Sequence, residues 1–253
     1  MTAVRLVSIG DSFSEGVGDE LPDGTARGWA DLTAQGWADA LGEPIEYANF
    51  AIRGRLIDPI VDEQLEPALA LRPTHLSFNG GGNDMLRPRA DIERIADRYL
   101  EVLARCDAEG VTLIALSAPD PSARLPLGRL IKRRGDALTS AVLRRTRQRA
   151  DIVVADNWTD PAFADPSLWS EDRLHLGPRG HHRVSARVLA SLGLPVPPAA
   201  REAPERPAAA SGGSAQYYRT HVAPWLRRRL TGTSSGDGRT AKYPELVRIA
   251  PSA

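Results

Sequence analysis

Short apolar runs recur along residues 4–156, and each is followed by a longer stretch of different periodicity. The runs are five to seven residues long and rich in β-branched residues, a pattern typical of buried strands. They predict strands at Val4–Ile9, Ile45–Phe50, His75–Asn79, Val111–Ser117 and Ile152–Asp156.

Between and after these runs, apolar residues recur three and four positions apart, which is the spacing of one helix face. This pattern predicts helices at Trp29–Leu41, Ile57–Leu71, Asp91–Glu109, Leu130–Arg149 and Pro178–Leu192. The third helix has the clearest apolar stripe, and Gly110 follows it where a C-cap glycine belongs. The last helix begins at a proline, which the first turn of a helix tolerates.

The order of these elements indicates the class of fold. Five strand-then-helix repeats predict a mostly parallel sheet covered by helices on both faces. In such sheets, ligands bind beyond the carboxyl ends of the strands. The residues that directly follow each strand are therefore the candidates for chemistry.

Composition and charge limit the binding partners and the cellular compartment that we expect for the protein. Hydrophobic residues make up 42% and charged residues 25%, as in ordinary globular domains. Lys plus Arg and Asp plus Glu both number 32, so no net charge favours nucleic acid or a membrane as partner. Cys106 is the only cysteine and falls in a helical pattern, which predicts a buried, unreactive thiol and suits the cytoplasm. We find no signal-peptide pattern and no apolar run of about 20 residues, so we expect neither export nor a transmembrane segment.

The chain changes character near residue 194. Residues 195–215 are rich in Pro, Ala, Gly and Ser, which predicts a linker between a domain at residues 1–194 and a basic extension at residues 216–253. Within the extension, Tyr217–Leu230 predicts either an amphipathic helix that packs on the domain or a segment that contacts an anionic surface or a partner. Residues 234–253 are predicted to be irregular.

A serine follows the first predicted strand, in the run GDSFSEG at residues 10–16. A parallel sheet presents catalytic groups at this end, so Ser12 is a candidate nucleophile, and Gly10 permits the tight turn before it. Asp11 is expected to brace that turn by accepting hydrogen bonds from backbone N–H groups. The same letters also occur in simple turns in which Ser or Asp caps a helix.

Glycine-containing loops follow the second and third strands. The first loop ends in Gly54, and a glycine lets a ligand approach the backbone closely. The second reads GGGND at residues 80–84, which makes Asn83 a candidate amide donor, or else makes Asn83 or Asp84 the cap of a following helix. A phosphate-binding loop is excluded there, because GxGxxG is missing and no Lys-Ser or Lys-Thr pair follows at the required spacing.

The segment after the fifth strand carries an acid and a base three residues apart, Asp172 and His175. An imidazole that takes a serine proton needs a carboxylate to hold its tautomer and stabilise its charged form, and one short turn provides both groups here. Asp172 could instead cap the next helix. A metal site with His181 and His182 is a further alternative, but no third ligand has a familiar spacing. We expect these two histidines to be partly exposed, and His75, which begins a strand, to be structural.

These segments resemble the signature blocks of the GDSL, or SGNH, hydrolase family, which are named after a serine, a glycine, an asparagine and a histidine. The chain has these landmarks in the family order at Ser12, Gly54, Asn83 and His175. Asp172 stands at the family's DxxH spacing, and Phe13 replaces the leucine of the family pattern. The resemblance spans residues 1–193 and implies a three-layer α/β/α sandwich with a five-stranded parallel sheet in flavodoxin-like order.

The resemblance also implies what these residues do. Ser12, His175 and Asp172 would form a catalytic triad. The N–H groups of Ser12 and Gly54 and the side-chain amide of Asn83 would form the oxyanion hole. We therefore expect an esterase or lipase that hydrolyses small carboxylic esters and needs no cofactor and no metal. An acyltransferase or a thioesterase with the same site, or a non-catalytic binding module with the same fold, remain the alternatives.

Overall fold

The structure is a computed structural model that describes residues 3–146, 149, 152–196 and 234–252. Its sheet has six strands in the order β5-β4-β3-β1-β2-β6. Their bounds are β1 Arg5–Ile9, β2 Ile45–Asn49, β3 His75–Phe78, β4 Thr112–Ser117, β5 Val153–Asp156 and β6 Tyr243–Ile249. The first five strands are parallel and follow the flavodoxin-like order, as expected.

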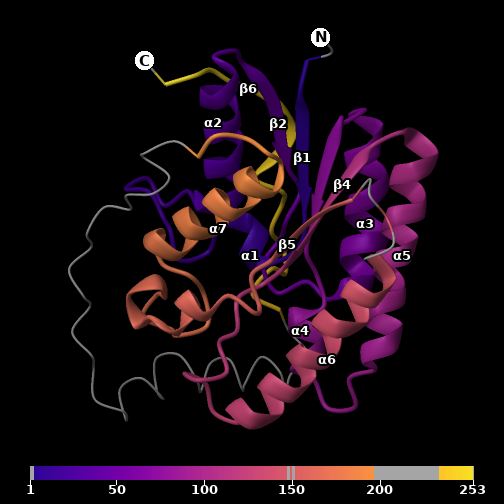
Figure 1. Cartoon of the computed structure of the whole chain (residues 1–253), viewed down its shortest axis with the longest axis vertical. Helices are drawn as coiled ribbons and strands as arrows, with labels where there is room; N and C mark the ends of the chain where they lie inside the picture. Colours follow the sequence, from indigo (N-terminus) through magenta and orange to yellow (C-terminus); the bar gives the residue numbers. More distant parts are fainter. Residues whose placement is uncertain (1–2, 147–148, 150–151, 197–233, 253) are drawn as a thin grey trace.

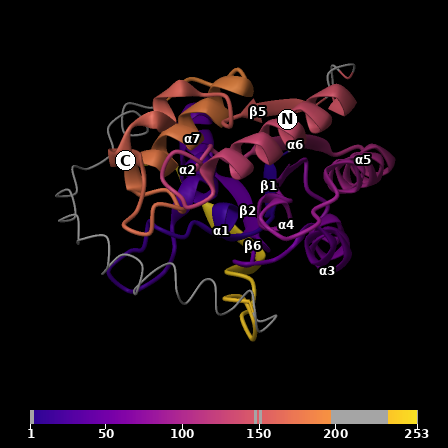
Figure 2. The same cartoon turned by 90° about the horizontal axis from the view of Figure 1, so that it is seen from below.

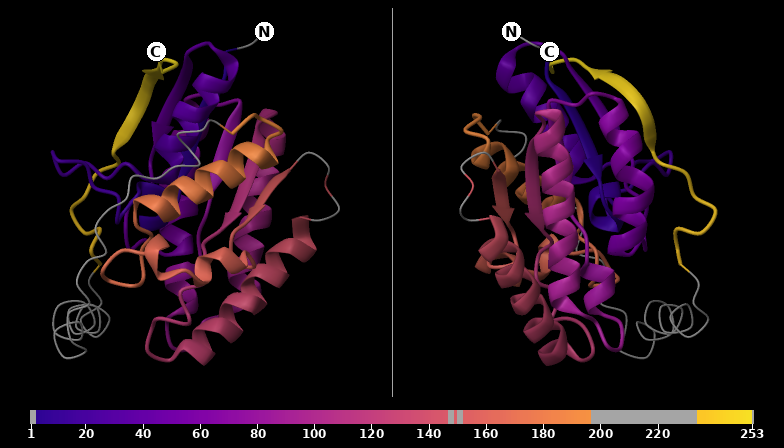
Figure 3. Two further views of the ribbon diagram at one scale, coloured as in Figure 1. Left: turned by 60° about the vertical axis from the view of Figure 1, so that its left-hand side comes forward. Right: turned by 90° about the vertical axis from the view of Figure 1, so that its right-hand side faces the viewer.

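The sixth strand corrects the predicted five-stranded sheet. β6 lies within residues 234–253, for which the sequence predicts irregular chain, and it pairs antiparallel with β2. Figure 3 shows it in yellow along one edge of the sheet. Two features explain why the sequence does not predict β6. Pro244 is typical only of edge strands, and the register shifts between Tyr47 and Asn49, which breaks the two-residue alternation.

Helices cover both faces of the sheet, as predicted (Figure 1). On one face α2 (Gly28–Leu41) packs against α7 (Pro178–Ser191). On the other face α5 (Ile92–Glu109) packs between α3 (Ile57–Ala70) and α6 (Gly128–Thr146). Each predicted helix is present and ends within three residues of its predicted bounds. Among the described residues, none of the helices combines the length and the apolar composition that a membrane span requires.

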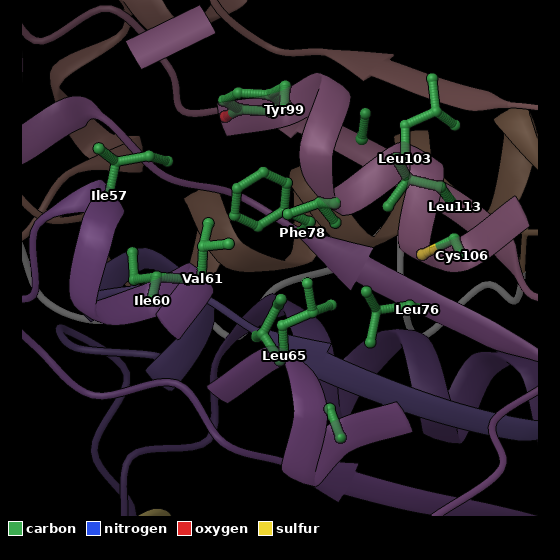
Figure 4. Close-up of a cluster of buried hydrophobic side chains, with 14 of the residues drawn as sticks. Ile57, Ile60, Val61, Leu65, Leu76, Phe78, Tyr99, Leu103, Cys106 and Leu113 are labelled. Carbon is green, nitrogen blue, oxygen red and sulfur yellow. The ribbon is translucent and has the colours of Figure 1, made fainter. Parts of the chain in front are cut away.

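The larger apolar cluster fills the space between the sheet and the layer of α3, α5 and α6. Figure 4 shows Leu76 and Phe78 of β3 pointing into it, opposite Val61 and Leu65 of α3. Cys106 of α5 is fully buried in this cluster, and burial raises the pKa of its thiol to about 12. The prediction that this thiol is buried is therefore confirmed, and its raised pKa is in keeping with the predicted lack of reactivity.

The second cluster lies under α2 and α7 and includes the C-terminal strand. Its large buried side chains include Trp29, Trp37 and Tyr47, and β6 adds the partly buried Tyr243 and Val247. The sequence places residues 216–253 in an extension outside the domain, whereas β6 within it completes the sheet and its core. The predicted linker beyond residue 196 and the predicted amphipathic segment lie outside the described residues.

The carboxyl ends of the parallel strands lie at the end of the molecule opposite the two termini (Figures 1 and 3). Two short helices that the sequence does not predict begin there, α1 (Ser12–Glu15) after β1 and α4 (Gly82–Met85) after β3. Figure 2 looks at this end and shows α1 and α4 near the centre, between the two helical layers. The sheet thus brings the loops that carry the candidate residues to one place.

Candidate active site

The turn before Ser12 is held on both sides of the backbone. The Gly10 N–H donates to Gln64 Oε1 at 2.8 Å, and the Gly10 carbonyl accepts from Gln64 Nε2 at 3.1 Å. Asp11 Oδ1 accepts from the Phe13 N–H at 3.1 Å and so caps α1, which confirms the bracing role predicted for Asp11. Ser12 is the first residue of α1, and its position follows from these contacts.

Ser12, His175 and Asp172 lie in one hydrogen-bonded chain. Ser12 Oγ is 3.0 Å from His175 Nε2, and His175 Nδ1 is 2.5 Å from Asp172 Oδ2. A carboxylate accepts hydrogen bonds, so it favours the tautomer with the proton on Nδ1. Nε2 of His175 is then free to accept the proton of the serine hydroxyl.

A tight turn at residues 170–175 holds the acid and the base. The Ser170 N–H donates to the His175 carbonyl at 2.9 Å and closes the turn. Asp172 Oδ1 accepts from Ser170 Oγ at 2.7 Å, from the Leu174 N–H at 3.0 Å and from the His175 N–H at 2.9 Å. Because Oδ1 is occupied by the turn itself, Oδ2 is directed at the imidazole.

Burial and charge act against each other at this pair. Burial lowers the pKa of His175, but the hydrogen bond and the charge of Asp172 outweigh it, and the pKa of His175 lies above its ordinary value. Burial raises the pKa of Asp172, but hydrogen bonds from His175 and Ser170 bring it well below the ordinary range. The pair therefore favours a charged imidazole beside a carboxylate, which is the state that forms when histidine takes a proton.

A third acid, Asp11, lies close to the pair. Burial raises the pKa of Asp11 to about 6, and the neighbouring charge of His175 opposes this shift. Asp11 Oδ2 also accepts from Asn83 Nδ2 at 3.3 Å. Asp11 thus contacts the turn of the nucleophile and the candidate amide donor.

The candidate oxyanion groups are close to the same turn. In the part of the chain that the structure describes, no acceptor binds the N–H of Ser12 or of Gly54. Gly54 has φ +76°, a left-handed conformation that glycine adopts at little cost. The Asn83 amide donates to the Arg55 carbonyl at 3.0 Å as well as to Asp11. Asn83 therefore joins the loop after β2 to the turn that carries Ser12.

An ion pair that the sequence does not reveal ties the loop of Gly54 to α1. Glu15 Oε2 accepts from the Arg53 N–H at 2.6 Å, and Glu15 Oε1 accepts from the Arg53 guanidinium at 2.6 and 2.8 Å. Glu15 belongs to the GDSFSEG run, but nothing in that run indicates its partner. Gln64 on α3, which binds the backbone of Gly10, is a second residue that supports the site and that no sequence pattern indicates.

His181 and His182 correct another expectation, because both are buried, with exposures of 0% and 8%. α7 packs against α2, and His181 contacts Trp29 of α2 directly. His181 Nδ1 accepts from the Trp29 N–H at 3.1 Å, and His181 Nε2 donates to the Val17 carbonyl at 3.1 Å. Burial lowers the pKa of His181 to about 4, so this ring is neutral and joins backbone segments.

Two further candidates have structural positions. Asp84 Oδ2 accepts from the Ile57 N–H at 2.9 Å, so Asp84 caps α3 and not the helix that follows it in sequence. His75 begins β3, and its ring packs edge-on against Trp37 with centroids 4.7 Å apart. Both residues support the fold around the site.

A cavity lies between α6 and the carboxyl ends of β3, β4 and β5. It encloses about 620 Å³ of space free of protein atoms, part of it open to solvent, and its lining is mostly apolar. The lining begins at Asp11 and Gly82, the neighbours of Ser12 and Asn83, and reaches Trp158. Across the described ranges, no three His, Cys, Asp or Glu side chains are grouped as metal ligands.

Comparison with solved structures shows the same fold in several proteins. The lipase Lip_vut3 from a goat rumen metagenome is 18% identical, with a TM-score of 0.63 over 75% of this chain and 97% of that chain. The protein TesA is 21% identical, with a TM-score of 0.60 over 74% and 97% of the two chains. The psychrotrophic esterase EstA from Pseudoalteromonas sp. is 18% identical, with a TM-score of 0.59 over 75% and 96%. At these identities the likeness is one of fold.

Comparison of the sequence with protein families is more specific. No curated protein matches the chain. The model of the GDSL-like Lipase/Acylhydrolase family matches residues 8–183, which include every candidate catalytic residue and more than half of the chain. The chain therefore belongs to the GDSL-like Lipase/Acylhydrolase family and is a hydrolase of ester bonds.

Proposed function

We propose that the protein hydrolyses carboxylic esters through a Ser12–His175–Asp172 triad and an acyl-enzyme. The continuous hydrogen-bonded chain from Ser12 Oγ to Asp172 Oδ2 carries this proposal. A serine hydroxyl is a weak nucleophile until a base removes its proton, and His175 is within reach of that proton.

In the first half of the reaction, Ser12 Oγ forms a bond to the carbonyl carbon while its proton passes to His175 Nε2. The charged imidazole is stabilised by Asp172. His175 then gives the proton to the alcohol oxygen as the bond between that oxygen and the acyl carbon breaks. An alcohol leaves and the acyl group stays on Ser12.

In the second half, water attacks the acyl carbon and gives one proton to His175. The bond from the acyl carbon to Ser12 Oγ breaks, and His175 returns the proton to Oγ. A carboxylic acid is released and the enzyme is restored. Each half passes through a tetrahedral intermediate with a negatively charged oxygen.

The N–H groups of Ser12 and Gly54 are available to this oxygen, and the amide of Asn83 is the third candidate donor. The contact of Asn83 with Asp11 is long, at 3.3 Å, so it can be exchanged for the oxyanion. One such donor contributes about 2.7–4 kcal/mol to lowering the barrier.

The same acyl-enzyme would support transfer to an alcohol or cleavage of a thioester. These alternatives differ in product and not in the triad. A transferase would form a new ester when an alcohol is added, and a thioesterase would hydrolyse acyl-CoA. A series of p-nitrophenyl esters of increasing acyl length would show whether the apolar cavity beside Asp11 takes part in selecting the acyl group.

The test of the proposal compares Ser12→Ala with Ser14→Ala. Ser14 lies on the same short helix, is buried, and its hydroxyl has no partner among the described residues, so its replacement is the matched control. We expect Ser12→Ala to lose p-nitrophenyl ester hydrolysis and labelling by a fluorophosphonate, and Ser14→Ala to keep both. Circular dichroism would verify that both variants fold.

Undiminished hydrolysis by Ser12→Ala would overturn the triad. A wild-type protein that neither hydrolyses esters nor reacts with the fluorophosphonate would support the non-catalytic binding module. We also propose that the reaction takes place in the cytoplasm, because the single cysteine is a buried free thiol. Fractionation of the native cells would test this location.

A further inference from the structure

A segment from beyond the family-matched residues lies against the loop that carries Gly54. We call residues 234–242 the strap. A Cβ on Gly54 would lie 2.3 Å from Ser234 Oγ, and a Cβ on Gly236 would lie 2.1 Å from the Arg53 carbonyl oxygen. The strap and the loop are therefore in direct contact at the backbone.

The strap ends in Lys242, whose ammonium is almost enclosed, with a side-chain exposure of 9%. Lys242 Nζ lies 2.9 Å from the Glu15 carbonyl oxygen, 2.6 Å from that of Ala26 and 3.0 Å from that of Arg27. It also forms an ion pair of 2.6 Å with Asp31 Oδ2. Four oxygen atoms thus surround an ammonium that has three N–H donors.

These oxygens belong to the last residue of α1, to the two residues that precede α2 and to the first turn of α2. Glu15 is the last residue of α1 and Ser12 is the first, so one helical turn connects the carbonyl that Lys242 binds to the nucleophile. The two backbones meet closely here, because a Cβ on Gly28 would lie 2.2 Å from the Gly16 Cα. A change in the position of Lys242 would therefore be transmitted to Ser12 through a short and tightly packed segment.

Other carbonyl groups of α1 and of the residues just after it are bound by side chains from within residues 8–183, the part of the chain that matches the family. Asn49 Nδ2 donates to the Ser14 carbonyl at 2.9 Å, and His181 Nε2 donates to the Val17 carbonyl. Lys242 binds the carbonyl of Glu15, which lies between these two. Lys242 itself directly precedes β6, whose first residue is Tyr243, so the sheet fixes its position.

We propose that Lys242 is a positioning residue of the active site, which holds α1 so that Ser12 Oγ meets His175 Nε2, while the strap holds the loop of Gly54. This inference rests on the proposed function of Ser12. The contact between Ser12 and His175 joins two elements that are far apart in the chain, so its length depends on how each element is anchored. Lys242 anchors α1, which carries Ser12.

The principal test replaces Lys242 by Met, which keeps a long side chain and removes the ammonium. The chain has one other lysine, Lys132, whose side chain is 50% exposed on α6, so Lys132→Met is the matched control. Active sites would be titrated with the fluorophosphonate, and kcat would be expressed per titrated site. Molecules that fail to fold do not react with the fluorophosphonate and therefore do not affect the kcat obtained in this way.

We expect Lys242→Met to lower kcat for p-nitrophenyl acetate about 10- to 100-fold, because displacements of about 1 Å at reacting groups have effects of this size. KM is expected to change little, since Lys242 is not among the residues that line the cavity beside Asp11. Lys242→Arg, which keeps the charge, is expected to restore part of kcat. Lys132→Met is expected to match the wild type.

A second pair of variants tests the strap without removing the ammonium. Gly236→Ala would force a Cβ against the Arg53 carbonyl oxygen, whereas a Cβ on Gly238 would meet nothing within 4 Å. We expect Gly236→Ala to lower kcat per titrated site and Gly238→Ala to lower only the melting temperature, through its positive φ of +73°.

The outcomes separate the two proposals. Wild-type kcat per titrated site in both Lys242→Met and Gly236→Ala, whatever their melting temperatures, would show that the strap is only structural and would overturn the inference. Activity in Ser12→Ala would overturn the proposed function itself. A loss of kcat in Lys242→Met that Lys242→Arg partly reverses would support the positioning role.

Discussion

Two histidines six positions apart in the chain have opposite properties. His175 lies in the turn before α7, and a carboxylate 2.5 Å from its ring raises its pKa. His181 lies in the first turns of α7, where a backbone N–H and a carbonyl bind its two nitrogens and burial lowers its pKa to about 4. His181 is fully buried and the His175 side chain is 23% exposed, and burial lowers the pKa of both rings, but only His175 has a carboxylate hydrogen-bonded to its ring that reverses this effect.

The difference shows what makes a histidine suitable for proton transfer. A ring with a donor on one nitrogen and an acceptor on the other is satisfied only when neutral, and it then serves as a link between backbone segments. A ring with a carboxylate on one nitrogen and a hydroxyl on the other can take a proton from the hydroxyl and remain stabilised. Substitutions at either histidine, or at the acids beside His175, should therefore affect either catalysis or stability according to these partners.

Replacing His175 by Ala is expected to lower kcat for p-nitrophenyl ester hydrolysis by at least about 10⁴-fold, because the base for both halves of the reaction is lost. Steady-state kinetics would measure this. Thermal unfolding should show a folded protein. A residual rate within ten-fold of the wild type would mean that another group is the base.

Replacing Asp172 by Asn tests the carboxylate of the pair. We expect kcat to fall about 10⁴-fold, since a neutral amide neither holds the required tautomer nor stabilises the charged imidazole. Glu171→Gln, which removes the exposed neighbouring carboxylate, is the matched control and should retain activity. Equal activities of the two variants would contradict the assigned role of Asp172.

Replacing His181 by Gln tests the neutral histidine through stability. In the wild type, the unfolded state takes up a proton near pH 6.5 and the folded state only near pH 4. Stability from this group is therefore complete above pH 6.5 and is lost as the pH falls, by about 2 kcal/mol between pH 7 and pH 5. His175 contributes with the opposite sign, because its raised pKa stabilises the fold at low pH and this contribution is lost as the pH rises.

Urea unfolding at pH 7 and pH 5 would measure the effect. We expect His181→Gln to be about 1–3 kcal/mol less stable at pH 7, since one amide replaces a ring that spans two partners. We also expect its stability to change less between pH 7 and pH 5 than that of the wild type. Its kcat per titrated site should stay close to the wild-type value. A large loss of kcat would mean that His181 contributes to catalysis.

Replacing Asp11 by Asn has the smallest expected effect. The charge of Asp11 raises the pKa of His175, so its removal should move the acid limb of the profile of kcat/KM against pH to lower pH. The shift is expected to be less than about one pH unit. An unchanged acid limb would indicate that Asp11 does not act on His175 electrostatically.

Local patterns were sufficient to predict the framework of the fold. The five parallel strands and five long helices are present near their predicted bounds, because each has its own apolar periodicity or terminal signal. Gly110 and Asp91 illustrate this, as cap residues at the two ends of α5. β6 has neither a regular alternation nor a typical flank, and it forms a strand only because the edge of β2 offers it backbone partners.

In the candidate site, too, some residues could be predicted from the sequence and others could not. Ser12, Gly54, Asn83, Asp172 and His175 could be named from the sequence because each stands just after a strand or in a short motif. The motifs and strand ends of one chain are enough to name such residues, and the sheet then brings them together. Their proposed roles remain predictions that the variants above would test.

Only the tertiary structure decided which residues hold that site in place. The partner of Glu15 is 38 positions away, that of Gly10 is 54 positions away, and Lys242 reaches Glu15 across 227 positions. His181 is buried because α2, far from it in sequence, covers its face of α7. A local pattern has no information about such contacts, since they arise when distant segments exclude water from one another and must satisfy their polar groups together.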